Sequence, residues 1–419
     1  TGNAGHIGPL ASYYLTDDVS ELGDNLPVVD LGVSIQARGV KVGRYSTCAV
    51  LTDDRLKCFG YNNYGQLGQG DRTNRGLTPL EMGNNLEFVD LGTGRTINNI
   101  LDFEDVLSIN YHSACAIPDA GTMKCWGIAQ RSKLVNASNS ANLSEFGTET
   151  GDNLPIVNFA GDNPIQVSVG LQHTCAVLQS NDLKCWGESG AGQTGLETTT
   201  DQIVTPNTLA AVNLGTGRTA QKVSTGYYHT CALLDDNTVK CFGDNAYGQL
   251  GYGSNVDRGG NALDMGDNIP IVDLGTGRTA VDIELQGYSS CAILDDATVK
   301  CWGYGSYGNL GAGSTTHLGD GPSEMGDVLS PVNLGTGRTA TKLYGGINQM
   351  CAKLDNGDVK CWGRNNTAQM AQGHRYDIGE SPLSLGDNLA AINISSTESI
   401  TTIQVNEYVG CAVLSDNTL

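Results

Sequence analysis

"NLGTGRTAQKVSTGYYHTCALLDDNTVKCFGDNAYGQLG" spans residues 213–251, and a near copy, "DLGTGRTAVDIELQGYSSCAILDDATVKCWGYGSYGNLG", spans residues 273–311. Each copy holds two cysteines ten positions apart. The first cysteine of such a pair recurs at Cys48, Cys115, Cys175, Cys231, Cys291, Cys351 and Cys411. The intervals are 67, 60, 56, 60, 60 and 60 residues. The chain is therefore a series of seven units, and self-similarity at this period is the signature of a repeat architecture.

Each unit contains several short stretches that favour strands. In the unit around Cys231 these stretches cover residues 221–226, 229–234, 238–243 and 269–275. Four short strands per unit, separated by turns, are typical of a propeller blade. We therefore predict an all-β fold, a seven-bladed β-propeller of four-stranded blades. An open solenoid is the alternative, and it would need polar caps at both ends.

The two ends of the sequence complement one another in the phase of the repeat. "ELGDNLPVVDLG" at 21–32 matches "DMGDNIPIVDLG" at 264–275, so the N-terminus resumes the repeat where the C-terminus leaves it. A ring closed by strands from both termini leaves few exposed sheet edges. We expect residues 1–419 to form a single propeller domain, in which segment 1–32 completes the blade begun at about 400–419.

The paired cysteines predict disulfides. A hairpin with a three-residue loop places residues ten positions apart directly opposite one another, within disulfide range, and its last loop position favours Gly, Asn or Asp. Six of the seven units have Gly, Asn or Asp at that position, while the fifth has Ala297. Buried reduced thiols are the alternative. The predicted pairs are Cys48–Cys58, Cys115–Cys125, Cys175–Cys185, Cys231–Cys241, Cys291–Cys301 and Cys351–Cys361, while the partner of Cys411 would fall two positions after Leu419.

One disulfide per unit implies an oxidising compartment, so we expect an extracellular or cell-surface location. Four Asn-x-Ser/Thr sequons agree with passage through the secretory pathway. Chance is the alternative, because such triplets are common in a chain rich in Asn and Thr. The candidate glycosylation sites are Asn136, Asn142, Asn365 and Asn393.

The charge of the chain argues against two classes of partner. The sequence has 24 Lys and Arg against 45 Asp and Glu, a formal net charge of −21. Nucleic acids and anionic membranes both require basic patches. No apolar run approaches the ~18 residues of a membrane helix, so we expect no membrane insertion of this segment. The 56 glycines agree with many turns.

The polar residues that recur do so unit by unit, which indicates structural roles. Three histidines precede cysteines, and we expect them to form hydrogen bonds within blades: His112, His173 and His229. Four arginines close a Gly-Thr-Gly-Arg motif and are expected to bind carbonyls or acids at turns, rather than a shared anion: Arg95, Arg218, Arg278 and Arg338. No catalytic or metal-binding motif occurs, so we predict a protein that is not an enzyme and has no cofactor and no metal.

The stretch "GYYHTCALLDDNTVKCFGDNAYGQLG" at 226–251 resembles the regulator-of-chromosome-condensation repeat, and "GLQHTCAVLQSNDLKCWGESGAGQTG" at 170–195 does so too. The resemblance extends over all seven units and implies a seven-bladed propeller whose ends meet in one blade. The paired cysteines suggest a secreted or surface type. Members of the family act as nucleotide exchange factors for the small GTPase Ran. This chain departs from the pattern at 126–150 and 363–373, and binding specificity is expected at such irregular connections.

Three functions remain open at this point. The preferred hypothesis is a non-enzymatic secreted or cell-surface propeller that binds a protein or glycan partner, or builds an extracellular assembly by self-association. A guanine-nucleotide exchange factor for a small GTPase is one alternative. A secreted propeller that inhibits an enzyme is another. Fold alone does not decide among them.

Overall fold

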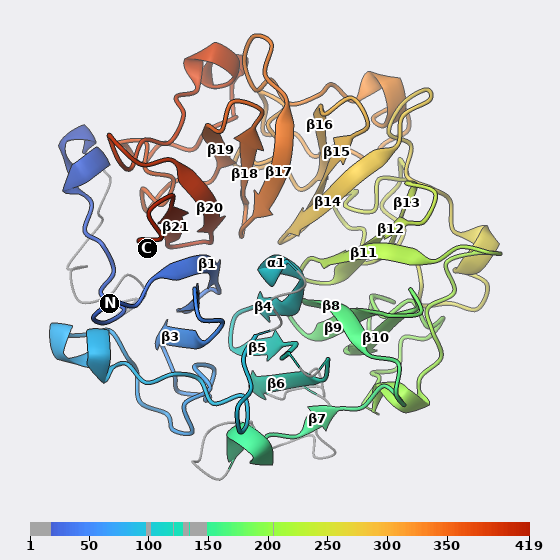
Figure 1. The fold of residues 1–419 in the computed structure, drawn as a ribbon. Coiled ribbons are helices and arrows are strands. Elements are labelled where there is room, and N and C mark those ends of the chain that lie inside the picture. Colours follow the sequence, from blue (N-terminus) through green and yellow to red (C-terminus); the bar gives the residue numbers. More distant parts are fainter. Residues whose placement is uncertain (1–17, 98–101, 120, 129–133, 135–148, 204) are drawn as a thin grey trace.

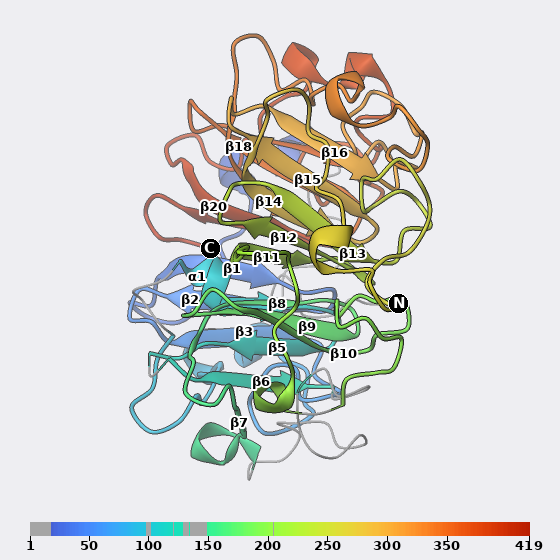
Figure 2. The same ribbon diagram turned by 90° about the vertical axis from the view of Figure 1, so that its right-hand side faces the viewer.

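A computed structural model describes residues 18–97, 102–119, 121–128, 134, 149–203 and 205–419. Within these ranges, strands form seven antiparallel sheets arranged around a common centre (Figure 1). The side view shows neighbouring sheets stacked face to face (Figure 2). The fold is therefore all-β, and seven sheets agree with the seven repeat units.

The strands follow the same order in each unit, from the centre outwards. The first three sheets contain β1 (Ala37–Val42), β2 (Ser46–Leu51) and β3 (Leu56–Gly60); β4 (Leu107–Ile109), β5 (Ser113–Ala116), β6 (Met123–Gly127) and β7 (Ile156–Val157); and β8 (Pro164–Val169), β9 (His173–Leu178) and β10 (Leu183–Gly187). The next four contain β11 (Ala220–Thr225), β12 (His229–Leu234) and β13 (Val239–Gly243); β14 (Ala280–Gln286), β15 (Ser289–Leu294) and β16 (Val299–Gly303); β17 (Ala340–Gly345), β18 (Gln349–Leu354) and β19 (Val359–Gly363); and β20 (Ile400–Val405) and β21 (Gly410–Leu414).

Helices are short and lie outside the sheets. One α-helix, α1 (Phe103–Val106), directly precedes β4 and lies near the centre of the ring (Figure 1). The 3-10 turns are Val19–Glu21, Gly23–Asn25, Pro79–Glu81, Gly83–Asn85, Gly151–Asn153, Pro206–Thr208, Gly266–Asn268, Gly326–Val328, Pro382–Ser384 and Gly386–Asn388. Most of them fall on the repeated Gly-Asp-Asn motif or on the proline before it.

Among the described residues, the prediction of four strands per blade holds for one sheet, the one that contains β7. In the unit of β11–β13, the expected fourth strand at 269–275 makes one backbone hydrogen bond to the sheet, from Val272 N to Val239 O at 2.8 Å. Pro270 has no N–H to donate, and the Leu274 carbonyl accepts from the Nζ of Lys300 in the next unit instead. Because its polar groups are used elsewhere, this segment runs beside the sheet without forming a regular ladder.

In four units, a buried lysine holds the outer segment through hydrogen bonds to two backbone carbonyls. Lys300 donates from Nζ to the carbonyls of Leu274 and Gly326, at 2.9 and 2.8 Å, and it is 6% exposed. Beside it, Thr276 donates its backbone N–H to Asp327 at 2.8 Å. The same arrangement occurs at Lys57, Lys240 and Lys360. The repeated sequences Lys-Cys, Leu-Gly-Thr-Gly and Gly-Asp are thus parts of one contact that joins successive units.

Large aromatic side chains fill the space between sheets. The residue after the second cysteine is buried in every complete unit: Phe59, Trp126, Trp186, Phe242, Trp302 and Trp362. The indole of Trp302 donates to Gln249 O of the preceding unit at 3.1 Å. A Cβ at Gly251 would lie 2.8 Å from that indole nitrogen, so the glycine is required by close approach. The Gln-Leu-Gly and Cys-Trp-Gly motifs therefore form one interface between neighbouring sheets.

The six predicted cysteine pairs are joined by disulfides in the structure. Each links the second strand of a sheet to the third, with Cα atoms 4.0–4.1 Å apart. This spacing is shorter than the ~5.5 Å of a hydrogen-bonded pair and is closer to that of a non-hydrogen-bonded pair. The last loop residue is left-handed in each hairpin, and Ala297 adopts φ 61° despite its Cβ. Cys411 is free and buried.

Contacts connect the first and last described sheets. Val29 N donates to Leu419 O at 2.7 Å, and Ala37 N donates to Asn417 O at 2.9 Å. Asp24 accepts from Ser396 N at 2.8 Å, as Asp327 does from Thr276. The inter-unit contact of the repeat therefore recurs between segments 372 positions apart in the sequence. β1 and β21 lie side by side (Figure 1).

Candidate functional site

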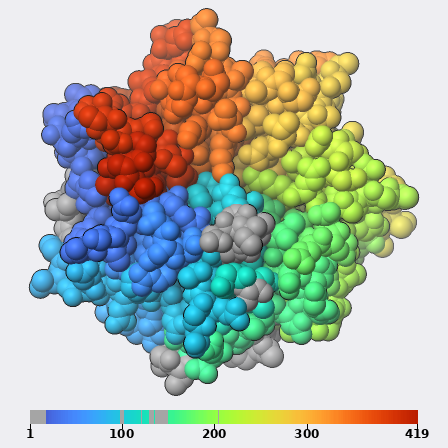
Figure 3. All heavy atoms as spheres, viewed as in Figure 1, coloured from blue at the N-terminus to red at the C-terminus, as the bar shows by residue number. Residues whose placement is uncertain are grey.

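A cavity of about 350 Å³ lies between the inner strands of all seven sheets. In the space-filling view, segments from along the whole chain surround the middle of one face (Figure 3). Charged side chains dominate the cavity lining, three of them positive and five negative: Lys41, Lys222, Lys342, Asp102, Glu104, Asp105, Asp282 and Glu284. None of these residues was singled out in the sequence, because they come from five different units and share no motif.

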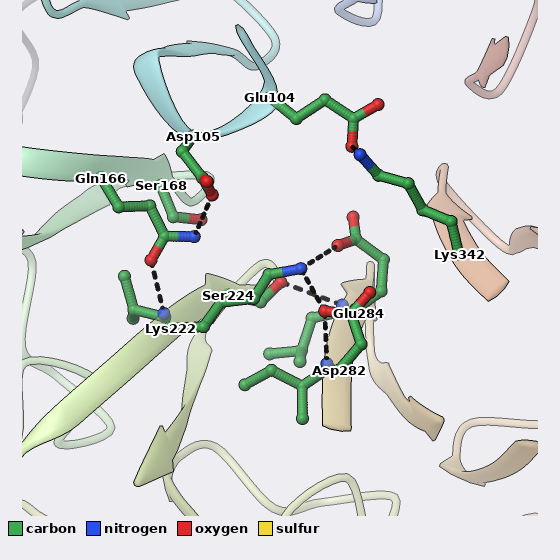
Figure 4. Close-up of polar contacts among 12 residues, drawn as sticks. Glu104, Asp105, Gln166, Ser168, Lys222, Ser224, Asp282, Glu284 and Lys342 are labelled. Carbon is green, nitrogen blue, oxygen red and sulfur yellow. Dashed lines mark hydrogen bonds and ion pairs between the residues drawn. The ribbon is translucent and has the colours of Figure 1, made fainter. Parts of the chain in front are cut away.

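These charges form two groups of ion pairs (Figure 4). Lys222 of β11 places its Nζ 2.5 Å from Asp282 and 3.9 Å from Glu284, both on β14. Lys342 of β17 contacts Asp102 at 3.0 Å and Glu104 at 2.7 Å, at the start of α1. The ion pairs therefore bind neighbouring inner strands together and hold α1 across the ring to β17.

Burial in the cavity shifts the pKa values of these groups. Burial raises the pKa of Glu284 to about 7, although the charge of Lys222 opposes the shift. Burial disfavours the charged form of Lys222, but Asp282 and Glu284 outweigh it, so the pKa of Lys222 is raised. Burial also raises the pKa of Asp105, whose carboxylate accepts from Gln166 at 3.0 Å. Lys222 thus keeps its positive charge between the two acids of β14.

The polar side chains of the cavity hold neighbouring inner strands together. Six of its eight charged side chains form ion pairs, and its hydroxyls accept from backbone N–H groups of neighbouring strands, as Ser224 does from Leu285 at 3.0 Å. Within the described ranges, no group of three or more His, Cys, Asp or Glu side chains is arranged to hold a metal ion. We therefore interpret the ion pairs as internal supports of the ring.

Aromatic side chains gather where the inner strands end and turn back, and Tyr227 among them also lines the cavity. We call this surface the tyrosine face, and it consists of Tyr45, Tyr61, Tyr64, Tyr111, His112, Tyr227, Tyr228, Tyr247, Tyr288, Tyr304, Tyr307, His317 and Tyr408. Every member is partly exposed. Each ring lies 4.8–6.5 Å from the centroid of another member. Tyrosine combines a large apolar ring with a hydroxyl that bonds water or a partner, which suits a binding surface.

One half of the tyrosine face contains a bound guanidinium of the chain itself. The Cζ of Arg44 lies 4.3 Å from the ring centre of Tyr111 and 5.1 Å from that of Tyr45. Its Nε lies 2.7 Å from a carboxylate oxygen of Glu407, which also pairs with Arg364 at 3.1 Å. Glu407 is 8% exposed, so both arginines are held against a largely buried acid.

The other half lies over the sheets of β11–β13 and β14–β16. Tyr247 is 5.4 Å from Tyr288 and 5.0 Å from Tyr304, centre to centre. The hydroxyls of Tyr111 and Tyr227 lie 2.9 Å apart and join the two halves. Asp244 is on the same side, since its backbone N–H donates to Tyr228 O at 2.9 Å. The tyrosine face is thus one continuous surface with charged residues at both halves.

The structure separates the histidines that the sequence grouped together. His173 and His229 are buried and contact hydroxyls of the next unit, Thr230 at 2.9 Å and Ser290 at 3.0 Å. Their role is structural, but the contacts run between blades and not within them as predicted. His112 instead lies on the tyrosine face, 4.8 Å from Tyr64.

The arginines of the Gly-Thr-Gly-Arg motif contact acids at turns, as the sequence predicted. Arg218 pairs with Asp236 at 2.5 Å, and Arg278 with Asp295 at 3.1 Å. Equivalent contacts occur at Arg95 and Arg338. These pairs are about one-third exposed or more, so each contributes little to stability.

The candidate glycosylation sites differ in their surroundings. Asn365 is fully buried and its amide donates to His374 O at 2.8 Å, so the folded chain leaves no room for a glycan on this side chain. The Asn365 side chain also accepts from Met370 N and so holds the link after β19. Asn393 is exposed. Asn136 and Asn142 lie outside the described residues.

Sequence reasoning missed the tyrosine face, although a signal was present. Three positions before the first cysteine, the units carry Tyr45, His112, Gln172, Tyr228, Tyr288, Asn348 and Tyr408. Three positions after the second cysteine they carry Tyr61, Ile128, Glu188, Asp244, Tyr304 and Arg364. These positions vary, while the second cysteine and the glycine two positions after it do not.

The sheets, disulfides and interlocking motifs define the class of the protein, a disulfide-bonded β-propeller. The family model for the "Regulator of chromosome condensation (RCC1) repeat" matches residues 37–66, 165–193 and 220–249. The chain therefore contains RCC1 repeats, matched in the units of β1–β3, β8–β10 and β11–β13.

Relatives in other organisms match parts of this chain. The human E3 ubiquitin-protein ligase HERC2 is 26% identical over 336 residues, which is 79% of this chain and 6% of the ligase. The Arabidopsis thaliana ultraviolet-B receptor UVR8 is 29% identical over 228 residues, which is 54% of this chain and 45% of the receptor. The chain thus spans less than half the length of these relatives.

Solved structures support the propeller fold. Prp20p from Saccharomyces cerevisiae aligns with a TM-score of 0.64 at 18% identity, over 90% of this chain and 83% of that protein. Human WBSCR16 aligns with the same TM-score at 14% identity, over 91% of this chain and 86% of that protein. Among the described residues, none of the helices has the length and apolar character to cross a membrane.

Proposed function

We propose that the protein is a non-enzymatic propeller of the extracellular space or cell surface, which binds a partner protein through the tyrosine face. The tyrosine face carries this proposal. Tyr and Arg are enriched in protein interfaces and dominate their binding energy, whereas a surface with only a solvating role would carry Lys, Glu and Asp. The tyrosine face unites residues from five units, which agrees with a broad contact.

The six disulfides support the proposed compartment. A disulfide in every complete unit is rare in proteins of the reducing cytosol and common in secreted ones. Exposed Asn393 is the sequon that remains compatible with a glycan in the described part of the chain. Peptide mapping of the native protein without reduction tests this part: free thiols in all six pairs would contradict it.

We also propose that residues 1–419 form one closed ring, with segment 1–32 completing the blade begun at 400–419. The hydrogen bonds from Val29 to Leu419 and from Ser396 to Asp24 support this closure. Residues 1–17 lie outside the described part of the chain. A closed ring predicts that limited proteolysis leaves the two ends associated after a single cut in a link.

Site-specific cross-linking tests the binding function. A photoreactive amino acid is placed at Tyr288 on the tyrosine face, and at Leu383, which is 79% exposed and outside that face, as the matched control. The cross-linked partner is identified by mass spectrometry and its dissociation constant for the purified protein is measured. We expect a partner from position 288 alone, with affinity that falls when tyrosines of the face are replaced. Equal products from both positions would contradict the proposal.

A nucleotide exchange factor for a small GTPase is the second candidate. It is favoured by the RCC1 repeats and by the likeness to Prp20p, which is described as binding Gsp1p and histones. The test is the release of bound nucleotide from a panel of purified small GTPases. Accelerated release, lost when tyrosines of the face are replaced, would establish this function and displace the extracellular one.

A further inference from the structure

One half of the tyrosine face already holds a guanidinium, that of Arg44 of the same chain. A guanidinium lies over the rings of Tyr111 and Tyr45 and pairs with Glu407. The guanidinium carbon lies 4.3 and 5.1 Å from two ring centres while its Nε lies 2.7 Å from the acid, so cation–π attraction and an ion pair act on the same group. The chain therefore supplies its own example of a site built from tyrosines and one acid.

The half around Tyr288 contains the same components without a guanidinium. Tyr247, Tyr288 and Tyr304 lie 5.0–6.5 Å apart, centre to centre. Among the described residues, no lysine or arginine lies over these three rings, and none forms an ion pair with Asp244.

Asp244 is held in place for a partner. Gln249 donates from Nε2 to the Asp244 carboxylate at 2.5 Å and accepts from Tyr247 N at 2.9 Å, so it ties the acid to the aromatic cluster. Burial and the nearby charge of Asp257 raise the pKa of Asp244, and Asp244 contributes to the raised pKa of Tyr288, about 12, whose main cause is burial. The carboxylate is thus a partly buried charge that its surroundings do not neutralise.

We propose that the surface formed by Tyr247, Tyr288, Tyr304 and Asp244 binds an arginine side chain of a partner protein. This proposal rests on the proposed function and names the chemistry of its partner. A guanidinium would neutralise Asp244 and lie against the rings as Arg44 does in the other half. The net charge of −21 attracts a basic segment from a distance. A neutral sugar could stack on the rings but would leave Asp244 uncompensated, so the observations favour the arginine.

The experiment measures binding of labelled hexa-arginine and hexa-lysine peptides to the full, disulfide-bonded chain by fluorescence anisotropy. At an ionic strength of ~0.15 M, non-specific attraction is reduced and treats both peptides alike. We expect the arginine peptide to bind about 3- to 10-fold more tightly than the lysine peptide. Equal affinities, or no binding of either peptide, would overturn the proposal.

Matched variants locate the site. Asp244→Asn and Tyr288→Leu are each expected to weaken the arginine peptide by about 3- to 10-fold. Asp235→Asn and Tyr376→Leu are the controls, because they change the same residue types outside the tyrosine face, and they should leave the affinity unchanged. Asp244→Asn keeps the test valid if Tyr288→Leu disturbs the fold, since the amide is isosteric.

Two other outcomes separate this proposal from the proposed function. If cross-linking from position 288 gives a protein partner but the peptides do not discriminate, the face binds protein without an arginine site and this inference fails alone. If glycans bind and Tyr288→Leu removes that binding while Asp244→Asn does not, the surface stacks on sugar and the arginine proposal is overturned.

Discussion

Acid should weaken the protein through one buried histidine, His229. Its Nε2 lies 3.0 Å from the Ser290 hydroxyl, which itself donates to Gln249 O at 2.9 Å. Because the Ser290 hydroxyl donates its hydrogen to that carbonyl, it can only accept from His229. The neutral imidazole of His229 therefore carries its proton on Nε2. Nδ1 faces Gly226, where an added Cβ would lie 2.5 Å away, and it has no hydrogen-bond partner among the described residues. A second proton on the ring would therefore have no acceptor.

The magnitude follows from the pKa. Burial, with a smaller contribution from the charge of His173, lowers the pKa of His229 from 6.5 to about 3. The unfolded chain therefore binds the proton first, and stability falls as the pH drops below 6.5 towards 3. Between pH 7 and pH 5 this histidine alone should reduce the free energy of unfolding by about 2 kcal/mol, and by about 5 kcal/mol below pH 3.

The variant His229→Gln isolates this effect. Gln349 occupies the same repeat position in a later unit, so the fold accepts the side chain there. Hydrogen exchange of the β12 amides at pH 7 and pH 5 gives the local free energy of opening for both proteins. We expect the wild-type chain to lose about 2 kcal/mol more than the variant between the two pH values. His374→Gln is the control and should behave as wild type. An identical pH dependence in His229→Gln and wild type would refute the reasoning.

Three further changes test the repeat itself. Ala297→Asn should stabilise the protein by about 0.5–1 kcal/mol in thermal unfolding, because asparagine tolerates the left-handed turn better; unchanged stability would mean that the turn stores no strain. Replacing Cys291 and Cys301 by Ala should cost about 2–3 kcal/mol in the exchange of β15 and β16 amides, and a uniform loss in all sheets would contradict a local disulfide effect. Lys300→Met should cost about 2–3 kcal/mol, since two buried carbonyls lose their donor; Lys41→Met, in the open cavity, is the control.

Much of the architecture could be predicted from the sequence, because the same local motifs recur in successive units. The cysteine spacing predicts the hairpin between the second and third strands, and the structure shows its disulfide in all six complete pairs. The residue six positions after the first cysteine has a left-handed backbone, as the predicted three-residue loop requires, even where it is Ala297. These features depend on residues within one hairpin, where local backbone geometry decides the outcome.

The fourth strand could not be predicted in the same way. "IPIVDLG" at 269–275 has the composition of a strand, but Pro270 lacks an N–H and the Leu274 carbonyl is bound by Lys300 of the next unit. A lysine between a valine and a cysteine is expected to point to solvent. Its burial against two carbonyls requires a neighbouring unit to be in place, which no single repeat reveals. The burial of Asn365 has the same cause, since the link around it closes on its amide.

The sequence by itself determined the repeat, the pairing of the cysteines and the family, because a pattern that recurs at fixed spacing constrains local structure in each unit. Only the tertiary structure decided which residues of different units meet. Arg44 and Glu407 are 363 positions apart, and Tyr111 and Tyr227 are 116 apart, yet the ring places them in contact. The physical reason is that a propeller aligns equivalent positions of all units at one end, so a surface forms from single residues that carry no local motif.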